Sequence, residues 1–217
     1  REERLNDVNV QSSSPIFVYT VQSFIQNPND QAVKRRLEEH LQLLSQHYDY
    51  RAVYLVDQDA NLVIASNGDQ PVPAFDPALA QQALQSNETV MGRFFREADS
   101  EGIFIDMAAP INLGEISENY AIIFRSDPRE YLFSGIEKAL TLSETIDTAL
   151  LRVEGDRVRV LNRVKHDTAA PMTREVPVSE SDSIFVQAVI EPSGSIVGND
   201  LNGDMLRAEA VRIPESN

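Results

Sequence analysis

The fold is decided by a stretch that occurs twice: Met91-Gly92 with Gly102-Ile103-Phe104-Ile105-Asp106-Met107-Ala108, and Val197-Gly198 with Gly203-Asp204-Met205-Leu206-Arg207-Ala208-Glu209. The glycines at positions 102 and 203 are 101 residues apart, which is about the length of one small domain. Identity between the two stretches is low, but each lies at the same place in a similar series of predicted elements. We therefore interpret the chain as two related modules.

The elements around each stretch follow one order: hairpin, short helix, hairpin. In the first half, residues 52–56 and 62–65 are strand-like around a polar turn, Asp76-Pro77 begins a short helix, and strands follow at 90–97, 102–111 and 120–125. In the second half, we expect strands at 149–153, 158–164, 195–198 and 205–213 and a short helix at 183–190. This order predicts an α+β fold in which each module has an antiparallel sheet and short helices.

Residues 1–47 are predicted to be helical, because their apolar residues recur at steps of three and four. Ser14-Pro15 indicates either a helix start, with proline at the first helical position, or a kink. The polar segment 27–30 is a clearer break, in which Asn29 or Asp30 caps the next helix. The apolar surface of the first 26 residues exceeds what one small sheet needs, which favours a parallel homodimer through Leu5, Val8, Phe17, Val21 and Phe24.

Composition excludes several classes of protein. With 217 residues and 24.3 kDa, the chain is long enough for two domains. Its formal net charge of -15 argues against binding to nucleic acid or broadly to anionic lipid. The absence of cysteine removes thiol catalysis, disulfides and thiolate metal sites. The sequence holds no apolar run of membrane-spanning length and begins at Arg1, so we expect an excised segment, and any membrane anchor would lie outside it.

Element order and several motifs together resemble a known family. The motifs are Asp127-Pro128-Arg129-Glu130-Tyr131-Leu132-Phe133, Ser143-Glu144-Thr145, the run from Leu150 to Val158, Leu161-Asn162 and Lys165-His166. A long N-terminal helix followed by two PAS-like modules resembles the double-Cache sensor regions of bacterial transmembrane receptors. The tryptophan-proline pair often seen after the linking helix of that family is absent, since Ala139-Leu140-Thr141-Leu142 occupies its place.

The resemblance implies both an organisation and a function. Residues 1–47 would form stalk helices, 48–127 a membrane-distal PAS-like module, 128–147 a linking helix and 148–217 a membrane-proximal PAS-like module. Such a region is extracytoplasmic, or periplasmic, dimerises through its N-terminal helix and binds a small molecule in the distal module. The output enzyme, a histidine kinase or diguanylate cyclase, would lie outside this chain.

A candidate ligand site follows from strand alternation in the distal module. Asp106 interrupts an apolar strand and shares one face of it with Phe104, while Arg93 and Phe95 precede them and Tyr54 lies on the first strand. An acid and an arginine within an aromatic wall are suited to hold an amine or a carboxylate. The predicted ligand-binding residues are thus Tyr54, Arg93, Phe95, Phe104 and Asp106. The alternative is structural: Asp106 faces solvent or pairs with Arg93 or Arg125, and the rings belong to the core.

The sequence holds no recognisable catalytic motif and predicts no cofactor. Asp57-x-Asp59-x-Asn61 resembles the start of a calcium loop but lacks its glycine and its final acid, so we interpret it as a hairpin turn. No catalytic or metal site is predicted. Besides the sensor interpretation, two alternatives stay open: an α+β enzyme of hydrolase type, and a module that serves only for dimerisation or interaction.

Overall fold

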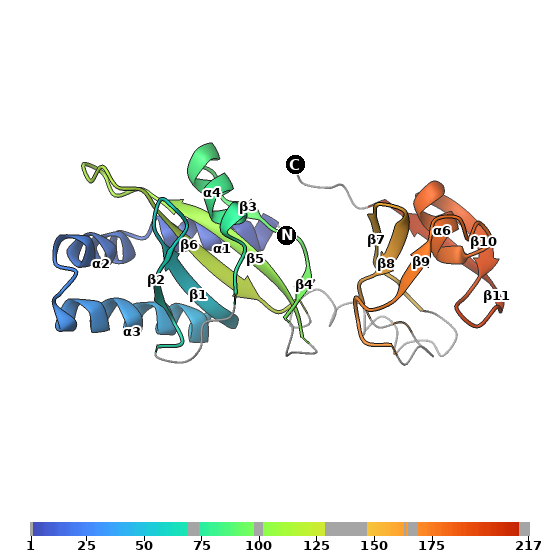
Figure 1. Ribbon diagram of the computed structural model, residues 1–217, viewed down its shortest axis with the longest axis horizontal. Helices are drawn as coiled ribbons and strands as arrows, with labels where there is room; N and C mark the ends of the chain where they lie inside the picture. Colours follow the sequence, from blue (N-terminus) through green and yellow to red (C-terminus); the bar gives the residue numbers. More distant parts are fainter. Residues whose placement is uncertain are drawn as a thin grey trace. The chain divides into compact units, whose positions relative to one another are not determined.

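The computed structural model describes residues 2–68, 74–97, 102–128, 147–162, 164 and 169–212 (Figure 1). The chain divides into two compact units, Arg1–Pro128 and Arg129–Asn217, which we call the first and the second unit. The predicted linking helix at 128–147 lies almost entirely outside the described residues. Within the described ranges, no helix combines the length and the apolar character needed to cross a bilayer.

Three helices open the first unit: α1 (Glu2–Ser12), α2 (Pro15–Gln26) and α3 (Gln31–His47). The helical segment is interrupted between α1 and α2, where Ser14 is the N-cap residue of α2 and Pro15 occupies its first turn. Proline fits there because the first turn needs no donor from its backbone nitrogen. Asp30 caps α3 by accepting hydrogen bonds from the backbone nitrogens of Ala32 and Val33. Both breaks are therefore where the sequence predicts them.

The sheet of the first unit is antiparallel throughout, with strand order β2-β1-β6-β5-β3 and β4 paired to β5. Its strands are β1 (Tyr50–Val56), β2 (Leu62–Ala65), β3 (Val90–Met91), β4 (Phe95–Arg96), β5 (Ile103–Ile111) and β6 (Tyr120–Ser126). The single strand expected at 90–97 is wrong: β3 and β4 are two short strands. The backbone leaves the regular ladder at Gly92, whose nitrogen donates to the carbonyl of Asp106.

The two faces of this sheet have different partners, and helices cover both (Figure 1). Alternate residues of the central strands pack on α1–α3 and form the larger apolar cluster, which includes Val53, Leu55, Met107, Ile122 and Phe124. The intervening residues face α4 (Pro77–Ser86), and their cluster includes Ala52, Tyr54, Ala108 and Ile123. Helix α4 begins at Asp76, which accepts a hydrogen bond from the Ala78 nitrogen, as the Asp76-Pro77 motif predicts.

The apolar residues that we expected at a dimer interface lie instead in the core of the first unit. Val8, Phe17 and Val21 have no exposed surface and Phe24 is 9% exposed, because all four pack in the core of the first unit. Leu5 packs against the same cluster. The apolar surface that these helices expose belongs to other residues: Val10, Ile16 and Tyr19.

The described part of the second unit has two small antiparallel sheets and the helix α6. One sheet contains β7 (Leu151–Glu154), β8 (Arg157–Val160) and β9 (Glu175–Pro177), and the other contains β10 (Ser193–Asn199) and β11 (Met205–Val211). Helix α6 (Ile184–Ile190) packs its buried residues Ile184, Phe185 and Val186 in the core of this unit. Strand β8 ends at Val160, earlier than the predicted 164, and β9 was not predicted.

The two glycines of the repeated stretch lie in matching places. A side chain at Gly92 would approach Leu79 in the first turn of α4, and one at Gly198 would approach the backbone of Ile184 at the start of α6. In each unit, then, a glycine at the end of a strand or within it allows close contact with the short helix. The predicted α+β fold with antiparallel sheets in both halves is confirmed.

Candidate functional site

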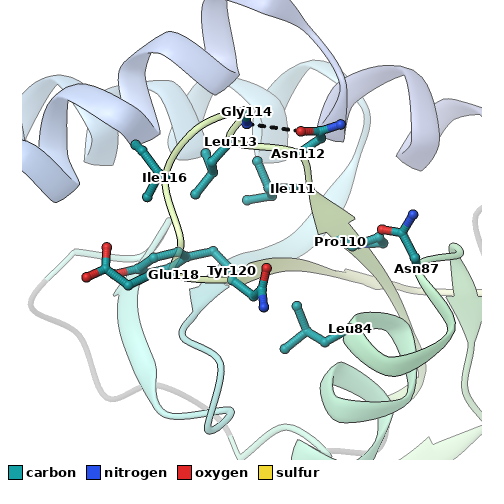
Figure 2. Close-up of a pocket in the computed structure, with 11 residues that line it drawn as sticks. Leu84, Asn87, Pro110, Ile111, Asn112, Leu113, Gly114, Ile116, Glu118 and Tyr120 are labelled. Carbon is teal, nitrogen blue, oxygen red and sulfur yellow. Dashed lines mark hydrogen bonds between the residues drawn. The ribbon is translucent and has the colours of Figure 1, made fainter.

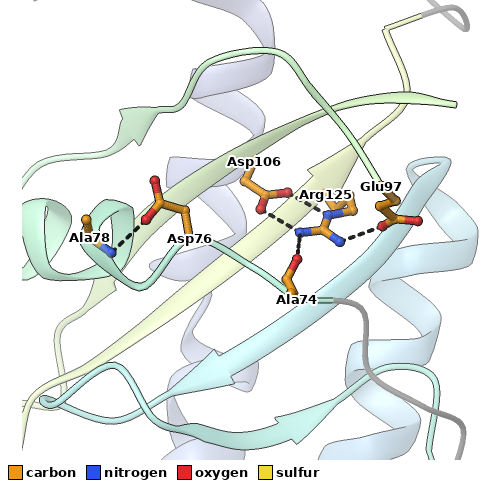
Figure 3. A network of polar contacts seen from close by, with 6 residues as sticks. All are labelled: Ala74, Asp76, Ala78, Glu97, Asp106 and Arg125. Carbon is orange, nitrogen blue, oxygen red and sulfur yellow. Dashed lines mark hydrogen bonds and ion pairs between the residues drawn. The ribbon is translucent and has the colours of Figure 1, made fainter. Parts of the chain in front are cut away.

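A buried arginine lies on the α4 face of the sheet in the first unit. Arg125, near the end of β6, has no exposed surface, and Asp106 on β5 is its direct cross-strand neighbour. Nε of Arg125 donates to Oδ1 of Asp106, and Nη2 donates to Oδ2, each over 2.8 Å (Figure 3). This two-pronged geometry fixes the plane of the guanidinium group as well as its position.

Two further acceptors complete the network around Arg125. Its Nη1 donates to Oε1 of Glu97 over 2.6 Å, and its Nη2 donates to the backbone carbonyl of Ala74 over 2.8 Å. Figure 3 shows that these groups come from separate segments: Ala74 precedes α4, Glu97 follows β4, and Asp106 lies within β5. One positive charge thus joins four segments of the first unit.

Aromatic rings surround the guanidinium group. The carbon at its centre lies 4.8 Å from the ring centroid of Phe95 and 5.4 Å from that of Tyr54. Phe75 stacks on Tyr54, with the ring centroids 5.4 Å apart. The ring of Phe104 lies beside that of Phe95, with the ring centroids 6.2 Å apart. Aromatic faces stabilise a cation, and they also form an apolar wall against which a small organic group can pack.

Burial changes the protonation equilibria of the site. Desolvation raises the pKa of Asp106, and the hydrogen bonds and charge of Arg125 oppose that rise. Desolvation by itself would lower the pKa of Arg125, but its hydrogen bonds with Asp106 and the charge of that carboxylate raise it overall. The arginine therefore keeps its charge inside the protein, and that charge depends on the carboxylates around it.

The hydroxyl group of Tyr54 has no hydrogen-bond partner among the described residues, although the side chain is fully buried. Burial also raises the pKa of Tyr54 to about 12, so the phenol stays protonated at neutral pH and can act as a donor. A buried polar group without a partner is costly. The hydroxyl group of Tyr54 is thus the part of this site that is most clearly suited to receive a ligand.

Four of the five predicted site residues lie together in this region: Tyr54, Phe95, Phe104 and Asp106. The fifth, Arg93, is exposed and lies one residue after Gly92, outside the network that contains Asp106. Arg125 takes the place in which we expected Arg93, and this pairing is the alternative that the sequence analysis left open for Asp106. The sequence does not predict Glu97, Ala74 and Phe75 as parts of this region, since only the pairing of β4 with β5 and the path of the chain before α4 reveal them.

Two hollows elsewhere in the first unit do not touch this network. One, of about 200 Å³, lies between the end of α4 and the loop that joins β5 to β6, and Figure 2 shows Asn87, Asn112 and Tyr120 among its lining residues. The Oδ1 atom of Asn112 accepts a hydrogen bond from the Gly114 nitrogen, so the loop uses this amide for its own turn. The other is a more open groove between α1 and residues 87–89. Neither hollow brings charged groups of opposite sign together.

The second unit holds a charged cluster of a different kind. On one face of its three-stranded sheet, Glu154 accepts hydrogen bonds from Nε of Arg152 and Nε of Arg159, each over 2.6 Å, and Arg159 also pairs with Glu175. These side chains are between 21% and 31% exposed, so water reaches all of them. The cluster is therefore a solvated ladder of ion pairs, in contrast to the buried network in the first unit.

The structure supports no metal site in the part of the chain that it describes: no three histidine, aspartate or glutamate side chains there are grouped to hold an ion. Asp57 accepts hydrogen bonds from the nitrogens of Asp59 and Asn61, which is the hairpin turn that the sequence predicts. Asp200 forms the equivalent turn in the second unit through the nitrogens of Asn202 and Asp204.

Two solved structures with a similar fold are a chemoreceptor ligand-binding domain and an extracellular domain. The chain is similar to the ligand-binding domain of the amino-acid chemoreceptor PctC of Pseudomonas aeruginosa PAO1, solved in complex with GABA, with a TM-score of 0.54 and 15% identity over 83% of this chain and 73% of that one. It is also similar to the extracellular domain of rpHK1S-Z16, a protein assigned as a histidine kinase, with a TM-score of 0.50 and 15% identity over 95% and 86% of the two chains.

In comparisons of sequence, no family model and no curated protein matches the chain. At 15% identity, the two structures establish the fold and leave the chemistry of the site to the residues described above. The fold agrees with the one that the double-Cache resemblance implies.

Proposed function

We propose that this chain is the extracytoplasmic ligand-sensing region of a transmembrane signalling receptor, and that it binds a small molecule in its first unit. The fold supports this proposal because the chemoreceptor structure that shares it is the ligand-binding domain of an amino-acid chemoreceptor, solved in complex with GABA. The observation that carries the proposal is the fully buried Tyr54 hydroxyl, which lacks a partner among the described residues beside the charged groups of Arg125 and Asp106.

The proposed contacts are those on the α4 face of the sheet. The apolar wall consists of Tyr54, Phe95 and Phe104. Asp106 and Arg125 provide the charged groups, and Asp106 fixes the orientation of Arg125 through two hydrogen bonds. Arg93 remains a proposed contact at the outer edge of the site, because it is exposed next to the hydrogen bond between Gly92 and Asp106.

The sheet offers a direct route for the signal. The proposed site lies on one face, and α1–α3 pack on the opposite face of the same strands. A ligand that rearranges Arg125 on β6 or Asp106 on β5 would therefore alter strands that support the N-terminal helices. Small shifts of packed helices are a common means of passing a signal through a receptor. The output enzyme, of histidine kinase or diguanylate cyclase type, would lie in the cytoplasm beyond this chain.

Homodimerisation through the N-terminal helices is part of the proposal, on a different surface from the one first expected. Since Val8, Phe17, Val21 and Phe24 fill the core, the available apolar residues are Val10, Ile16 and Tyr19, which are 54%, 72% and 65% exposed. Pairing of these exposed positions would bury apolar surface that the isolated unit leaves in water.

Tyr54→Phe tests the sensing function. A thermal-shift screen of small carboxylates, amino acids and amines against the 217-residue chain would first identify compounds that bind. For each of them, we expect Tyr54→Phe to weaken binding about two- to tenfold, because one hydrogen bond to the ligand is lost. The variant should fold at least as stably as the wild type, since the hydroxyl it removes has no partner in the described structure.

Tyr50→Phe is the matched control, because it removes the same group from the opposite face of the same strand. It should leave binding unchanged. If no compound binds, or if Tyr54→Phe binds every compound as the wild type does, the proposed site is wrong.

A further inference from the structure

The two carboxylates that bind Arg125 differ in how firmly the fold holds them. The side chain of Asp106 is 3% exposed and belongs to the nine-residue strand β5. The side chain of Glu97 is 17% exposed. Glu97 directly follows β4, a strand of only two residues, each of which pairs with one residue of β5. Because water already reaches Glu97 and little regular structure anchors it, its contact with Arg125 is the one that opens at the lower cost.

We propose that Glu97 is an internal competitor for a ligand carboxylate: a small monocarboxylate with an apolar body displaces Glu97 from Nη1 of Arg125 and accepts a hydrogen bond there. This inference rests on the proposed function, since it assumes that the site of the first unit binds a small molecule. It adds the chemical class of the ligand and the group that the ligand must replace.

The hydrogen bonds of Arg125 show which atom is available. Nε and Nη2 are held by Asp106 and the Ala74 carbonyl, while Nη1 contacts only Glu97 among the described residues. When Glu97 leaves, Nη1 is a buried donor that needs a new acceptor. A carboxylate fits best, because exchanging one carboxylate for another preserves the charge balance around Arg125. An amine in the same place would add a second positive charge beside the guanidinium group.

The surroundings of Arg125 define the rest of the ligand. The protonated hydroxyl of Tyr54 is a second donor without a partner in the described structure, and its ring lies next to the guanidinium group. The faces of Tyr54, Phe75 and Phe95 favour an apolar body. A second acidic group on the ligand would be repelled by Asp106 and Asp76, whose charges already act on one another.

Glu97→Gln separates competition from a structural role. Glutamine keeps the size of the side chain and can still accept from Nη1, but it lacks the charge that makes Glu97 a strong competitor. The probes are butyrate, butyramide and butylamine, which match in size and differ in charge, titrated by NMR into the 217-residue chain. We expect Glu97→Gln to bind butyrate about tenfold more tightly than the wild type does, with no gain for the other two probes.

Glu115→Gln is the matched control, because it removes the same charge from an exposed side chain in the loop between β5 and β6. Glu97→Asp, which keeps the charge but shortens the reach to Nη1, should also gain affinity for butyrate and serves if Glu97→Gln does not fold. The inference is overturned if neither Glu97 variant binds butyrate more tightly than Glu115→Gln, or if butylamine gains equally. A compound of another class that binds the wild type and depends on Tyr54 would overturn this inference and leave the sensing function intact.

Discussion

A guanidinium group with no exposed surface is stable only where its charge is balanced, and Arg125 is balanced by groups from three other segments. Asp106 is the most important of them, because it binds two nitrogens of the guanidinium group and is itself almost fully buried. The pair therefore has two roles in our interpretation: it orients Arg125 toward a ligand, and it connects β5 to β6.

Asp106→Asn should make the first unit markedly less stable. The substitution keeps the shape of the side chain but leaves Arg125 without its main counter-charge, and breaking one side of a buried ion pair typically costs about 3–5 kcal/mol. We expect a loss of that size in the free energy of unfolding. Tyrosine fluorescence during denaturation measures it in the first unit, which contains five of the six tyrosines of a chain that has no tryptophan.

The control for this measurement is Asp59→Asn, at an exposed position of the β1–β2 turn. It should change stability by less than about 0.5 kcal/mol. If Asp106→Asn is as stable as this control, the buried pair does not support the sheet in the way that its geometry indicates.

The sequence predicts the face on which Asp106 lies, but not its partner. Strand alternation correctly groups Phe104 and Asp106 on the side of α4, because side chains of a strand alternate between its faces. The choice between Arg93 and Arg125 depends on strand pairing. Asp106 stands opposite Arg125 because β5 and β6 form a hairpin with one particular register, which residue spacing within a single strand does not encode.

At the level of elements, the sequence predicts helices and long strands with a regular spacing of apolar residues well, but it does not predict the short strands. The three N-terminal helices, α4 and the long strands of the first unit agree with the sequence because caps and alternation mark them. Strand β9 has three residues and ends in proline, so it shows no alternation. The segment 90–97 does alternate, yet Gly92 directs it away from the ladder, and a glycine within a strand is the signal that indicates such a break.

Gly198→Ala tests the contact between strand and short helix in the second unit. A Cβ atom at this position would lie 2.8 Å from both Cα and N of Ile184, which are backbone atoms and cannot rotate away. We therefore expect a loss of about 1–3 kcal/mol in the stability of this unit. Hydrogen exchange of the amides in β10 and β11 measures the loss.

Two further variants serve as comparisons for Gly198→Ala. Gly92→Ala should cost less, since two of the three atoms nearest to a Cβ there belong to the flexible side chain of Leu79. Val197→Ala, on the exposed face of β10, should have little effect. Equal exchange rates in Gly198→Ala and Val197→Ala would mean that β10 and α6 are not packed as closely as the structure shows.

For the whole molecule, two features recur in both units: a glycine in or directly after a strand that lies against a short helix, and antiparallel strand pairs before and after that helix in the sequence. The units differ in what they bury. The first unit encloses an ionised network within aromatic rings, whereas the charged ladder of the second unit is open to water, and Arg207 and Glu209 of β11 are exposed. This difference supports our proposal that the first unit binds the ligand. Repetition in the sequence predicts the shared plan, but only side-chain burial distinguishes the two units.

The proposed dimer is a property of the intact receptor, because tethering to a membrane raises the effective concentration of the two copies. If α1 and α2 pair through their exposed apolar residues, then Ile16→Cys and Tyr19→Cys should each form disulfide-linked dimers under mild oxidation in membranes that contain the full-length receptor. This chain contributes no cysteine of its own, so the introduced thiols report on their own positions within it. Gln82→Cys, on an exposed part of α4, is the control and should form no disulfide-linked dimer. Dimers from Gln82→Cys at equal yield, or none from position 16 or 19, would show that the helices pair elsewhere or not at all.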